Sequence, residues 1–553
     1  MEKKLPIGTA DFRKLIETNC YYIDKTKFIE DILNDGAEVN LFTRPRRFGK
    51  SINLSMLKYF FYKTEVSELE RNKKLFKGLY IEHSPAFSEQ GKYPVIYISF
   101  KDIKSDSFEE TIEDIKNIIF NLFNEFLYIK EKLNEAEKNV FDFSWLMKGN
   151  ISQLKFSLKN LSNFLEKYYS EKVIILIDEY DTPLVNAYEK GYYYDMLNFF
   201  KVFYSSALKD NDNLRFGIMT GIIKVTQAGI FSDLNNLKIN NILSKNYDEY
   251  FGFTEKEVNK ILSDFSINGD IKKEVKSWYN GYKFGEKEIY NPWSILNFIA
   301  EKKILSFWLN TSDNFLIKDI LKKADNDLFN DLKKLFAGNS IVKNIEQNLN
   351  LKNDLENNDI WNLMLYSGYL TIKENIVDNT YALKIPNMEI KKFFKEKFMD
   401  IFLGGESTIK NLESSLENLY QDKEGSNKLE LEFNKILMKY PSYFDLENNE
   451  KIYHILILGI MIAFDKNYIV SSNRESGYGR YDLYIKNIKT QISYIFEFKT
   501  AKAEEKLNNS VNEAINQIKK REYSFDFQED KNIYGIGMAF YKKRVKLKYL
   551  KIK

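Results

Sequence analysis

Short apolar runs alternate with long amphipathic stretches over the first part of the chain. Four runs have the length of strands and end in polar or glycine-containing turns: 39–42, 93–100, 173–177 and 214–221. Runs that are apolar on both faces are typical of strands buried between two layers of helices, and the long helical stretches between them favour parallel connections. The pattern predicts an α/β domain whose parallel sheet is covered by helices.

The pattern changes after about residue 240. Shorter amphipathic segments follow, separated by the turn clusters WYNGYKFG, YNPW and IPN, and we interpret them as a mainly helical middle region. A polar stretch near residues 420 to 430 precedes a last α/β unit. Its pattern predicts a helix, three strands and a second helix, at 450–464, 468–472, 480–485, 491–499 and 506–520. The prediction is therefore three parts: 1–238, 239–400 and 401–553.

Composition narrows the chemistry of this 553-residue chain. It has two histidines, His83 and His454, and one cysteine, Cys20, which excludes a Cys/His zinc site and a disulfide framework. Its formal charge of +3 gives no uniform positive field, so any nucleic-acid binding must be local. We therefore expect catalysis by carboxylates, lysines or bound phosphates.

The sequence also indicates a compartment. The N-terminal segment MEKKLPIGTADF reaches glycine and charged residues before any apolar core develops, so it is unlike a signal peptide. The longest apolar run, Ile455–Phe464, falls far short of the roughly 20 residues that span a bilayer. We expect a soluble, cytoplasmic protein without a membrane partner.

A phosphate-binding motif lies between the first strand and the helix after it. The segment RPRRFGKS supplies Gly49, Lys50 and Ser51, which are the glycine, lysine and hydroxyl that a phosphate loop and its Mg²⁺ need. Arg44 replaces the leading glycine of such loops. The tripeptide alone fits a basic surface loop equally well, and its position between strand and helix favours nucleotide binding.

Acidic residues end the third strand, in VIILIDEYD. The strand delivers Asp178 to the carboxyl edge of the sheet, where it can hold Mg²⁺ through water. Glu179 is placed to orient or deprotonate a hydrolytic water. The alternative is an acidic strand end that caps a helix. Thr220, at the tip of the fourth strand, is a candidate sensor of the γ-phosphate, and a plain strand-end turn explains it equally well.

A second site is predicted near the C-terminus. In YIFEFK, alternation along a strand places Glu497 and Lys499 on one face. If RYDLYI forms a hairpin with this strand, residue 488 pairs with 491 and Asp482 stands opposite Glu497. Two adjacent carboxylates repel unless a divalent cation lies between them, and oxygen ligands suit Mg²⁺ or Mn²⁺. Taken alone, the pattern also fits a salt-bridged, exposed hairpin.

Many motifs fall in one order along the chain: IGTADFRKLI, YYIDKTKFI, TRPRRFGKS, YPVIYISFKD, LIDEYDTP, TGIIKVTQAGIFSDLNNL, WYNGYKFG, YNPWSILNF and YSGYL. Together they resemble the bacterial and archaeal AAA-ATPase-like family, whose members commonly end in a PD-(D/E)XK nuclease-like domain. The resemblance covers nearly the whole chain. It implies a P-loop NTPase parallel sheet, a helical middle or lid region and a C-terminal, mixed α/β, restriction-endonuclease-like domain.

The resemblance also implies roles for residues. In the nucleotide site, ATP and Mg²⁺ would be bound by the loop residues, with Asp178 and Glu179 as the second motif; the loop residues are Arg47, Phe48, Gly49, Lys50 and Ser51. An arginine-rich loop is usual for this family, so Arg44 does not count against binding.

In the nuclease-like domain, Asp482 and Glu497 would be metal ligands and Lys499 the catalytic lysine. Glu450 would be the acidic residue of the first helix, and Gln517 an auxiliary polar residue of the last helix. The helical spacing of apolar residues around Gln517 leaves it at the edge of a buried face.

We therefore expect an ATP-binding protein, an ATPase, joined to a Mg²⁺-dependent nuclease that acts on DNA, with Mn²⁺ as a second candidate metal at the nuclease site. Arg474 and Arg480 are candidate contacts to the nucleic-acid backbone. RNA as substrate and an oligomeric state stay open. The alternative is a regulatory or remodelling ATPase whose nuclease-like domain only binds nucleic acid or a partner.

Overall fold

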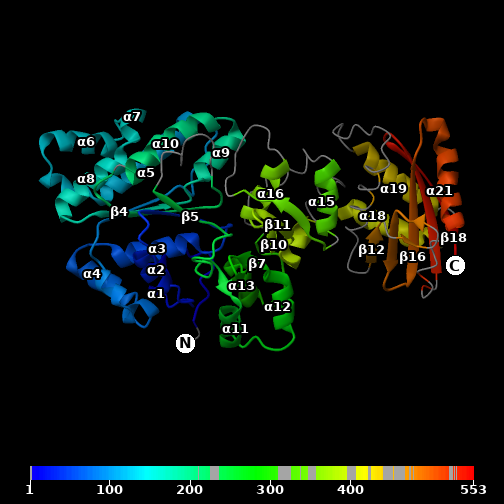
Figure 1. Ribbon diagram of the computed structural model, residues 1–553, viewed down its shortest axis with the longest axis horizontal. Coiled ribbons are helices and arrows are strands. Elements are labelled where there is room, and N and C mark those ends of the chain that lie inside the picture. Colours follow the sequence, from blue (N-terminus) through cyan, green and yellow to red (C-terminus); the bar gives the residue numbers. More distant parts are fainter. Residues whose placement is uncertain are drawn as a thin grey trace. The chain divides into compact units, whose positions relative to one another are not determined.

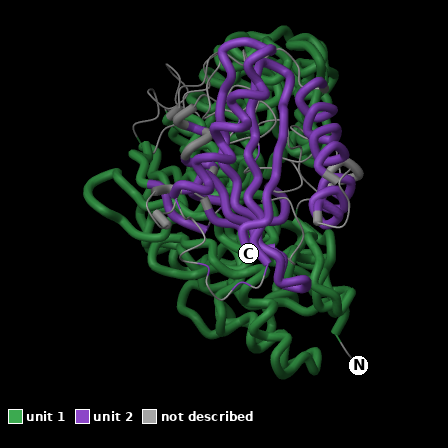
Figure 2. Tube along the Cα trace, turned by 90° about the vertical axis from the view of Figure 1, so that its right-hand side faces the viewer, with its two compact units in different colours: residues 1–312, 342–389 green, residues 313–341, 390–553 purple. Residues whose placement is uncertain are grey.

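The computed structural model describes most of the chain. The described residues are 3–209, 211–224, 236–308, 326–336, 338–346, 357–394, 406–420, 425–439, 453, 457, 468–472, 475–476, 479–521, 527, 530 and 532–553. They form two compact units, one of residues 1–312 and 342–389 and one of residues 313–341 and 390–553 (Figure 2). The first unit thus contains both the predicted parallel sheet and most of the middle region. The predicted division into three parts stays a prediction.

The first unit is built on a five-stranded parallel sheet in the order β2-β3-β4-β1-β5. Its strands are β1 (Val39–Thr43), β2 (Val95–Ser99), β3 (Val173–Asp178), β4 (Leu214–Gly221) and β5 (Leu237–Asn240). Every residue of β1 and β3 is buried, as apolar runs without alternation predict. The α/β interpretation of the sequence is confirmed, and β5 is a strand that the sequence pattern did not indicate.

Helices cover both faces of this sheet. Figure 1 shows one group on one side, namely α1 (Phe12–Glu17), α2 (Lys27–Asp35), α3 (Lys50–Phe61) and α4 (Val66–Lys74). On the other side lie α5 (Phe108–Glu125), α6 (Glu135–Trp145), α7 (Ile151–Leu154), α8 (Ser157–Tyr169), α9 (Thr182–Lys190) and α10 (Tyr193–Leu208). Three short 3-10 helices, at Tyr80–His83, Pro85–Glu89 and Leu127–Lys132, link them. In a three-layer arrangement of this kind, ligands bind at the carboxyl edge of the strands.

The middle region contains two small sheets besides its helices. One sheet, in the order β6-β8-β7, has β6 (Phe253–Thr254), β7 (Tyr282–Phe284) and β8 (Lys287–Tyr290). The other, in the order β10-β11-β9, has β9 (Ile341–Asn344), β10 (Thr371–Val377) and β11 (Thr380–Lys384). The sequence prediction of a mainly helical region missed both, because strands this short carry too few alternating positions to register as a pattern.

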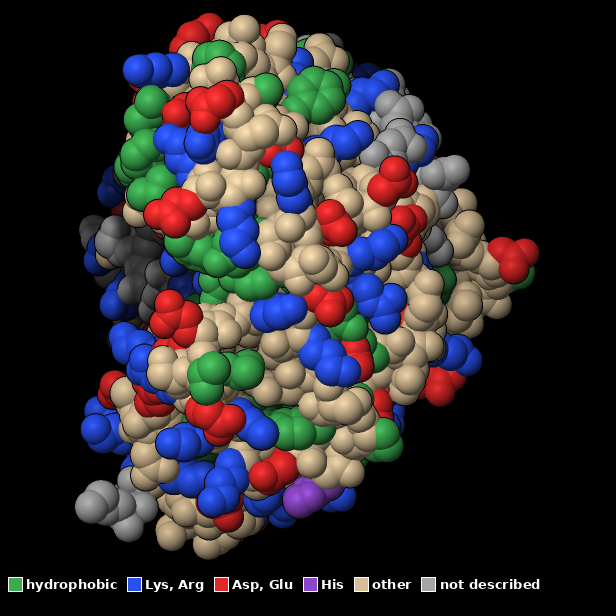
Figure 3. Space-filling view, turned by 90° about the vertical axis from the view of Figure 1, so that its left-hand side faces the viewer, with side chains coloured by type: hydrophobic (Ala, Val, Ile, Leu, Met, Phe, Trp, Pro, Cys, Tyr) green, Lys and Arg blue, Asp and Glu red, His purple; other side chains and the backbone are tan. Residues whose placement is uncertain are grey.

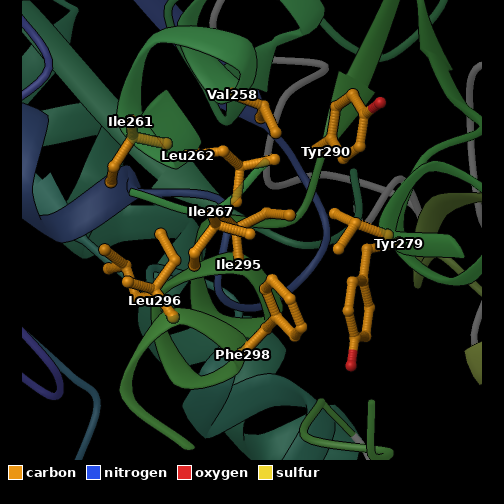
Figure 4. Packing of buried hydrophobic residues seen from close by; sticks show 11 residues of the cluster. Val258, Ile261, Leu262, Ile267, Tyr279, Tyr290, Ile295, Leu296 and Phe298 are labelled. Atoms are coloured by element: carbon orange, nitrogen blue, oxygen red, sulfur yellow. The ribbon is translucent and has the colours of Figure 1, made fainter. Parts of the chain in front are cut away.

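Three helices of the middle region share a core of their own. They are α11 (Glu255–Asp264), α12 (Ile271–Tyr279) and α13 (Pro292–Glu301), and the region also contains α16 (Asn357–Tyr366). Leu262, Tyr279 and Ile295 meet between these three helices, and the core also includes Ile267 and Tyr290 from outside them (Figure 4). This core holds α13 in place, and α13 carries Trp293, which contacts the phosphate loop.

The second unit is built on a mixed sheet in the order β12-β15-β16-β17-β18. Its strands are β12 (Tyr468–Ser472), β15 (Leu483–Asn487), β16 (Ile492–Thr500), β17 (Asn532–Tyr541) and β18 (Arg544–Lys551), and only β16 and β17 are parallel to each other. A small hairpin pairs β13 (Glu475–Ser476) with β14 (Gly479–Arg480). The predicted C-terminal α/β unit is thus present.

Helices lie on both faces of this second sheet. Helix α21 (Leu507–Arg521) covers one face, and α18 (Glu406–Glu417) and α19 (Gly425–Lys439) lie on the other (Figure 1). The unit also contains α15 (Asn326–Phe336) and two short 3-10 helices, Asn418–Tyr420 and Glu504–Lys506. The predicted helix 450–464, with Glu450 and His454, lies almost wholly outside the described residues.

Helix hydropathy and surface charge bear on membrane and nucleic-acid contacts of the described part of the molecule. In the described ranges, no helix has both the length and the apolar character that crossing a membrane requires. On the face of the molecule shown in Figure 3, positive and negative side chains are interleaved. This face therefore carries no uniform field, as the near-neutral charge predicts.

Candidate functional site

The phosphate loop connects β1 to α3 at the carboxyl edge of the parallel sheet. Gly49 ends the loop with a φ of 85°, a left-handed value that glycine adopts without strain, and α3 begins at Lys50. The first amides of α3 thus face the edge where ligands bind in such sheets. Phe48, which is fully buried, anchors the loop from below by packing against the rings of Tyr282 and Phe284.

The first turn of α3 and the ends of β3 and β4 bring Ser51, Asp178 and Thr220 together. Ser51 Oγ donates a hydrogen bond to Asp178 Oδ2 and Thr220 Oγ1 donates one to Asp178 Oδ1, each at 2.6 Å. Because the Asp178 side chain is only 1% exposed, burial raises the pKa of its carboxyl, and the two hydroxyls oppose that shift. Hydroxyl and carboxylate oxygens are the donors that Mg²⁺ prefers, so these residues fit a Mg²⁺ ion beside bound phosphates.

Lys50 is turned onto its own loop. Its Nζ donates hydrogen bonds to the backbone carbonyl oxygens of Arg44 and Pro45, both at 3.1 Å. The side chain is 5% exposed, and burial lowers the pKa of its ammonium group while nearby carboxylates oppose that shift. A buried ammonium group in the first turn of a helix is suited to bind phosphate oxygens.

Arg44 is buried and holds the backbone around it, a role that its place at the leading-glycine position of the motif did not predict. Its side chain is fully buried and donates to the carbonyl oxygens of Thr43 (2.9 Å), Asn240 (2.8 Å) and Tyr247 (3.2 Å). The rings of Phe251 and Phe284 lie within 5.3 Å of its guanidinium carbon. Burial lowers its pKa to about 9. Arg44 therefore ties the loop to β5 and the middle region.

Glu179 and Arg47 both line one cavity. Both have left-handed backbones, with φ of 51° and 70°, which costs about 1–3 kcal/mol for each residue and is typical of functional sites. The guanidinium of Arg47 lies 4.2 Å above the ring of Trp293, and burial lowers its pKa. Glu179 Oε2 accepts a hydrogen bond from Thr182 Oγ1. Both residues thus combine a strained backbone with a place in the cavity lining.

The cavity has a volume of about 430 Å³. One part is lined by the phosphate loop, including Lys50 and Ser51, and by Glu179. Other parts are lined by the N-terminal segment at residues 8–10 and by Trp293. Lys101 and Lys104, from the loop after β2, add positive charge to the lining. The cavity is thus large enough for more than a phosphate group.

Tyr180 and Asp181 are functional neighbours that the sequence analysis did not single out. Asp181 Oδ2 accepts hydrogen bonds from the backbone amides of Ile222 (2.8 Å) and Ile223 (2.9 Å), and Tyr180 donates its hydroxyl to the Ile223 carbonyl (2.6 Å). These hydrogen bonds hold the backbone of Ile222 and Ile223, which follow Thr220. Burial raises the pKa of Asp181 to about 6. The signal available was the third carboxylate of IDEYD.

The second candidate site lies on the hairpin of β15 and β16. Leu483 pairs with Phe496 and Lys486 with Ser493, which is the register predicted from the sequence and places Asp482 opposite Glu497. Asp482 Oδ2 accepts a hydrogen bond from the backbone amide of Phe498 at 2.7 Å. Glu497 is 2% exposed, and Lys499 Nζ lies 3.1 Å from its Oε1. Asp482 is thus held against the strand of Glu497, and Lys499 pairs with Glu497.

Helix α21 covers the face on which Glu497 lies. Gly537, the β17 partner of Glu497, has no side chain, and a Cβ there would come within 2.9 Å of Ile515 Cγ1. The helix therefore approaches the sheet closely. Gln517 is partly buried on α21, on this side of the sheet. Glu450, the remaining predicted ligand, lies outside the described residues.

Asp482 and Glu497 supply hard oxygen donors beside a lysine, which fits a divalent cation such as Mg²⁺. Among the residues that the structure describes, no three His, Cys, Asp or Glu side chains form a group that could hold a metal ion. The described donors at this hairpin are therefore two carboxylates. His83 is exposed in a 3-10 helix and lies outside both sites.

Comparisons with known proteins match two separate stretches of the chain. Residues 6–231 match the family described as predicted AAA-ATPase, and residues 448–549 match the PD-(D/E)XK nuclease superfamily. The chain joins an AAA-ATPase-like domain to a PD-(D/E)XK nuclease-like domain. The phosphate loop and the strand ends around Asp178 lie in the first domain, and Asp482, Glu497 and Gln517 lie in the second.

A relative extends this likeness over nearly the full length. A protein of Azotobacter chroococcum mcd 1, described as an uncharacterized protein in the vnfD 5' region, is 25% identical over 558 residues. The alignment covers 97% of this chain and 96% of the relative. The similarity therefore spans the AAA-ATPase-like domain, the middle region and the PD-(D/E)XK domain together.

Proposed function

We propose that the AAA-ATPase-like domain binds Mg²⁺-ATP and hydrolyses it. The observation that carries this proposal is the set of hydrogen bonds that joins Ser51, Asp178 and Thr220 at the end of the parallel sheet, next to a buried Lys50. A hydroxyl and a carboxylate held together beside a lysine are the groups that position phosphates and Mg²⁺ in phosphoryl transfer.

Each chain group has a distinct role in this proposal. Lys50 and the first amides of α3 bind the phosphate oxygens, and Arg47 adds charge from the loop. Ser51 and Asp178 hold the Mg²⁺ ion, which neutralises charge on the phosphates when bound. Glu179 orients a water molecule and accepts its proton as the water attacks the terminal phosphate. Thr220 keeps the Asp178 carboxylate in position and is also our candidate for sensing the γ-phosphate.

The test separates binding from hydrolysis. We expect Lys50→Ala to weaken ATP binding about 100-fold, because it removes a buried cation from the phosphates. Glu179→Gln is expected to retain binding while hydrolysis falls about 100-fold. Lys73→Ala, an exposed lysine of the same unit, is the control. Calorimetry and phosphate release measure the two steps, and the proposal is wrong if purified protein with Mg²⁺ neither binds nor hydrolyses ATP.

We further propose that the PD-(D/E)XK domain is a Mg²⁺-dependent nuclease that acts on DNA. The support is the pairing of Asp482 with Glu497, with Lys499 Nζ 3.1 Å from the Glu497 carboxylate. The two carboxylates, together with Glu450, would hold the metal ion, which would lower the pKa of a bound water. Lys499 would stabilise the negative charge that develops on the phosphodiester, and Gln517 would orient the site.

Cleavage of plasmid and linear DNA with Mg²⁺ or Mn²⁺, with and without ATP, tests this second activity. Asp482→Asn should abolish it and Glu513→Gln, an exposed acidic residue of α21, should not. RNA is included as a substrate. We propose the cytoplasm as the compartment of the protein, because both ATP and nucleic acid occur there.

The alternative function is a regulatory or remodelling ATPase whose PD-(D/E)XK domain only binds nucleic acid or a partner. Its support is that Lys499 pairs with Glu497 and that the Phe498 amide donates to Asp482, contacts that a non-catalytic hairpin also makes. It predicts ATP hydrolysis that is lost in Lys50→Ala, nucleic-acid binding without cleavage, and no effect of Asp482→Asn on either.

A further inference from the structure

Trp308 is attached to the phosphate loop from a distant part of the sequence. Its side chain is 1% exposed, and the indole Nε1 donates a hydrogen bond to the backbone carbonyl of Arg46 at 3.1 Å. Its ring lies 5.3 Å from that of Tyr369. Lys50 binds the two preceding carbonyls of the same loop, those of Arg44 and Pro45. Side chains thus hold three consecutive carbonyls of the loop.

These three contacts respond differently to phosphates. Lys50 is the residue that we expect to turn to phosphate oxygens, and its hydrogen bonds to Arg44 and Pro45 compete with that role. The indole of Trp308 has one donor and no charge, so it has no reason to leave the Arg46 carbonyl for an anion. When Lys50 changes partner, the loop is held at Arg46 by Trp308, and a movement of the loop is passed to that residue.

Glu389 holds the backbone on which Trp308 is carried. It is fully buried, and its Oε1 accepts hydrogen bonds from the amides of Phe307 (2.6 Å) and Trp308 (2.8 Å). Its Oε2 accepts one from Ser294 Oγ (2.8 Å). Ser294 follows Trp293, whose ring lies under the guanidinium of Arg47 and whose Nε1 donates to the Phe307 carbonyl. A single buried carboxylate therefore connects to the loop by two routes.

The positions of Glu389 and Trp308 in the chain are also informative. The chain passes from the first unit to the second after residue 312 and again after residue 389. Glu389 is the last residue before one crossing, and Trp308 lies four residues before the other. The hydrogen bonds of Glu389 therefore tie together two of the places where the chain leaves the ATPase-containing unit.

We propose that Trp308 and Glu389 transmit the nucleotide state of the phosphate loop to the segments that lead into the nuclease-containing unit. The inference rests on the proposed binding of ATP. Nucleotide binding shifts the Arg46 carbonyl, the shift is carried by the indole of Trp308 to residues 307–308, and Glu389 passes it to the helical residues 388–394. Coupling between two sites is reciprocal. If the nucleotide shifts the conformational equilibrium of these segments by some factor, the segments change the affinity for the nucleotide by that factor.

The experiment uses the intact chain, Mg²⁺ and a non-hydrolysable ATP analogue. Calorimetry measures binding, and amide hydrogen exchange is followed in peptides that cover residues 303–308 and 387–394. In the wild type, the nucleotide should change exchange in both peptides about 5-fold or more. Trp308→Phe removes the N–H donor and keeps an aromatic ring, so we expect binding within about 3-fold of the wild type, which is a loss of under about 1 kcal/mol, and no exchange response.

Two further variants separate coupling from folding. Trp361→Phe changes another buried tryptophan of the first unit, 1% exposed, and should keep the exchange response. Glu389→Gln weakens the acceptor of two amides with little change in shape, and it carries the test if Trp308→Phe does not fold.

The outcomes distinguish this inference from the proposed function. If the wild type binds the analogue and neither peptide changes its exchange, or if Trp308→Phe and Glu389→Gln respond as the wild type does, the coupling is wrong and ATP binding stands. If calorimetry finds no binding to the wild type, the proposed nucleotide site and the coupling fail together.

Discussion

The phosphate-loop site and the carboxylate site of this chain are assembled in different ways. The first collects Ser51, Asp178 and Thr220 from three places far apart in the sequence, which only the strand order of the parallel sheet brings together. The second collects Asp482 and Glu497 from one hairpin, where the register alone sets them opposite each other. The comparison shows that a site built on long-range order depends on buried supports, whereas a hairpin site depends on local geometry.

The supports differ accordingly. Arg44, Asp181 and Thr220 around the phosphate loop are buried polar groups that hold backbone or side chains in place. At the hairpin, the Phe498 amide donates to Asp482 and Lys499 forms an ion pair with Glu497. Changes near the first site should therefore affect stability and function together, and changes at the second should affect function with little effect on the first unit.

The largest effect is expected from Glu497→Gln. Removing this carboxylate takes away a metal ligand, and since even outer partners of metal ligands are worth 10–100-fold, we expect cleavage to fall about 1,000-fold. ATP binding measured on the same sample should change less than about 2-fold, under 0.5 kcal/mol. Residual cleavage near the wild-type rate would show that Glu497 is no metal ligand.

Arg44→Gly tests the buried support of the phosphate loop. The substitution restores the leading glycine of common phosphate loops, yet it leaves three carbonyls without their donor, and we expect a loss of about 4 kcal/mol in unfolding free energy. Denaturant unfolding measures it. Arg44→Lys should be nearly as costly, because one ammonium group cannot span the same carbonyls. Tighter ATP binding at unchanged stability would contradict the structural role of Arg44.

Asp181→Asn tests a pH dependence. Because burial raises the pKa of this carboxyl to about 6, the folded protein binds the proton more tightly than the unfolded chain does. Stability should therefore fall as the pH rises from 4 to 6, by about 2 kcal/mol for this group. Urea unfolding at each pH measures the free energy of unfolding of wild type and variant. Asp181→Asn should lose this pH dependence, whereas the exposed control Asp195→Asn should keep it.

The smallest effect is expected from Thr220→Val. The change removes the hydroxyl that donates to Asp178 and keeps the shape, so we expect about 10-fold slower hydrolysis of ATP. Thr220→Ser should restore the rate, because it restores the donor. If Thr220→Val hydrolyses ATP at the wild-type rate, the hydrogen bond to Asp178 does not position the carboxylate for catalysis.

The same comparison explains what the sequence could predict. The hairpin register followed from counting residues back from the turn, so the pairing of Asp482 with Glu497 was predictable. The strands around Asp178 were visible as apolar runs, and the phosphate motif located Lys50 and Ser51. The contacts of Arg44, Trp308 and Glu389 were not predictable, because each joins segments whose proximity depends on the packing of the middle region. The helix that contains Glu450 stays untested, since it lies outside the described residues.

Two glycines of β17 set the spacing of the nuclease-like domain. At Gly535 and Gly537 a single methyl group would come within 2.9 Å of Ile518 and Ile515. The close approach of α21 to β17, which pairs with the strand of Glu497, thus depends on the absence of side chains at these two positions. A larger residue at position 537 would push α21, and Gln517 with it, away from the sheet and from the carboxylates. A compensating loss of volume at Ile515 would lower it again, so these two positions should vary together.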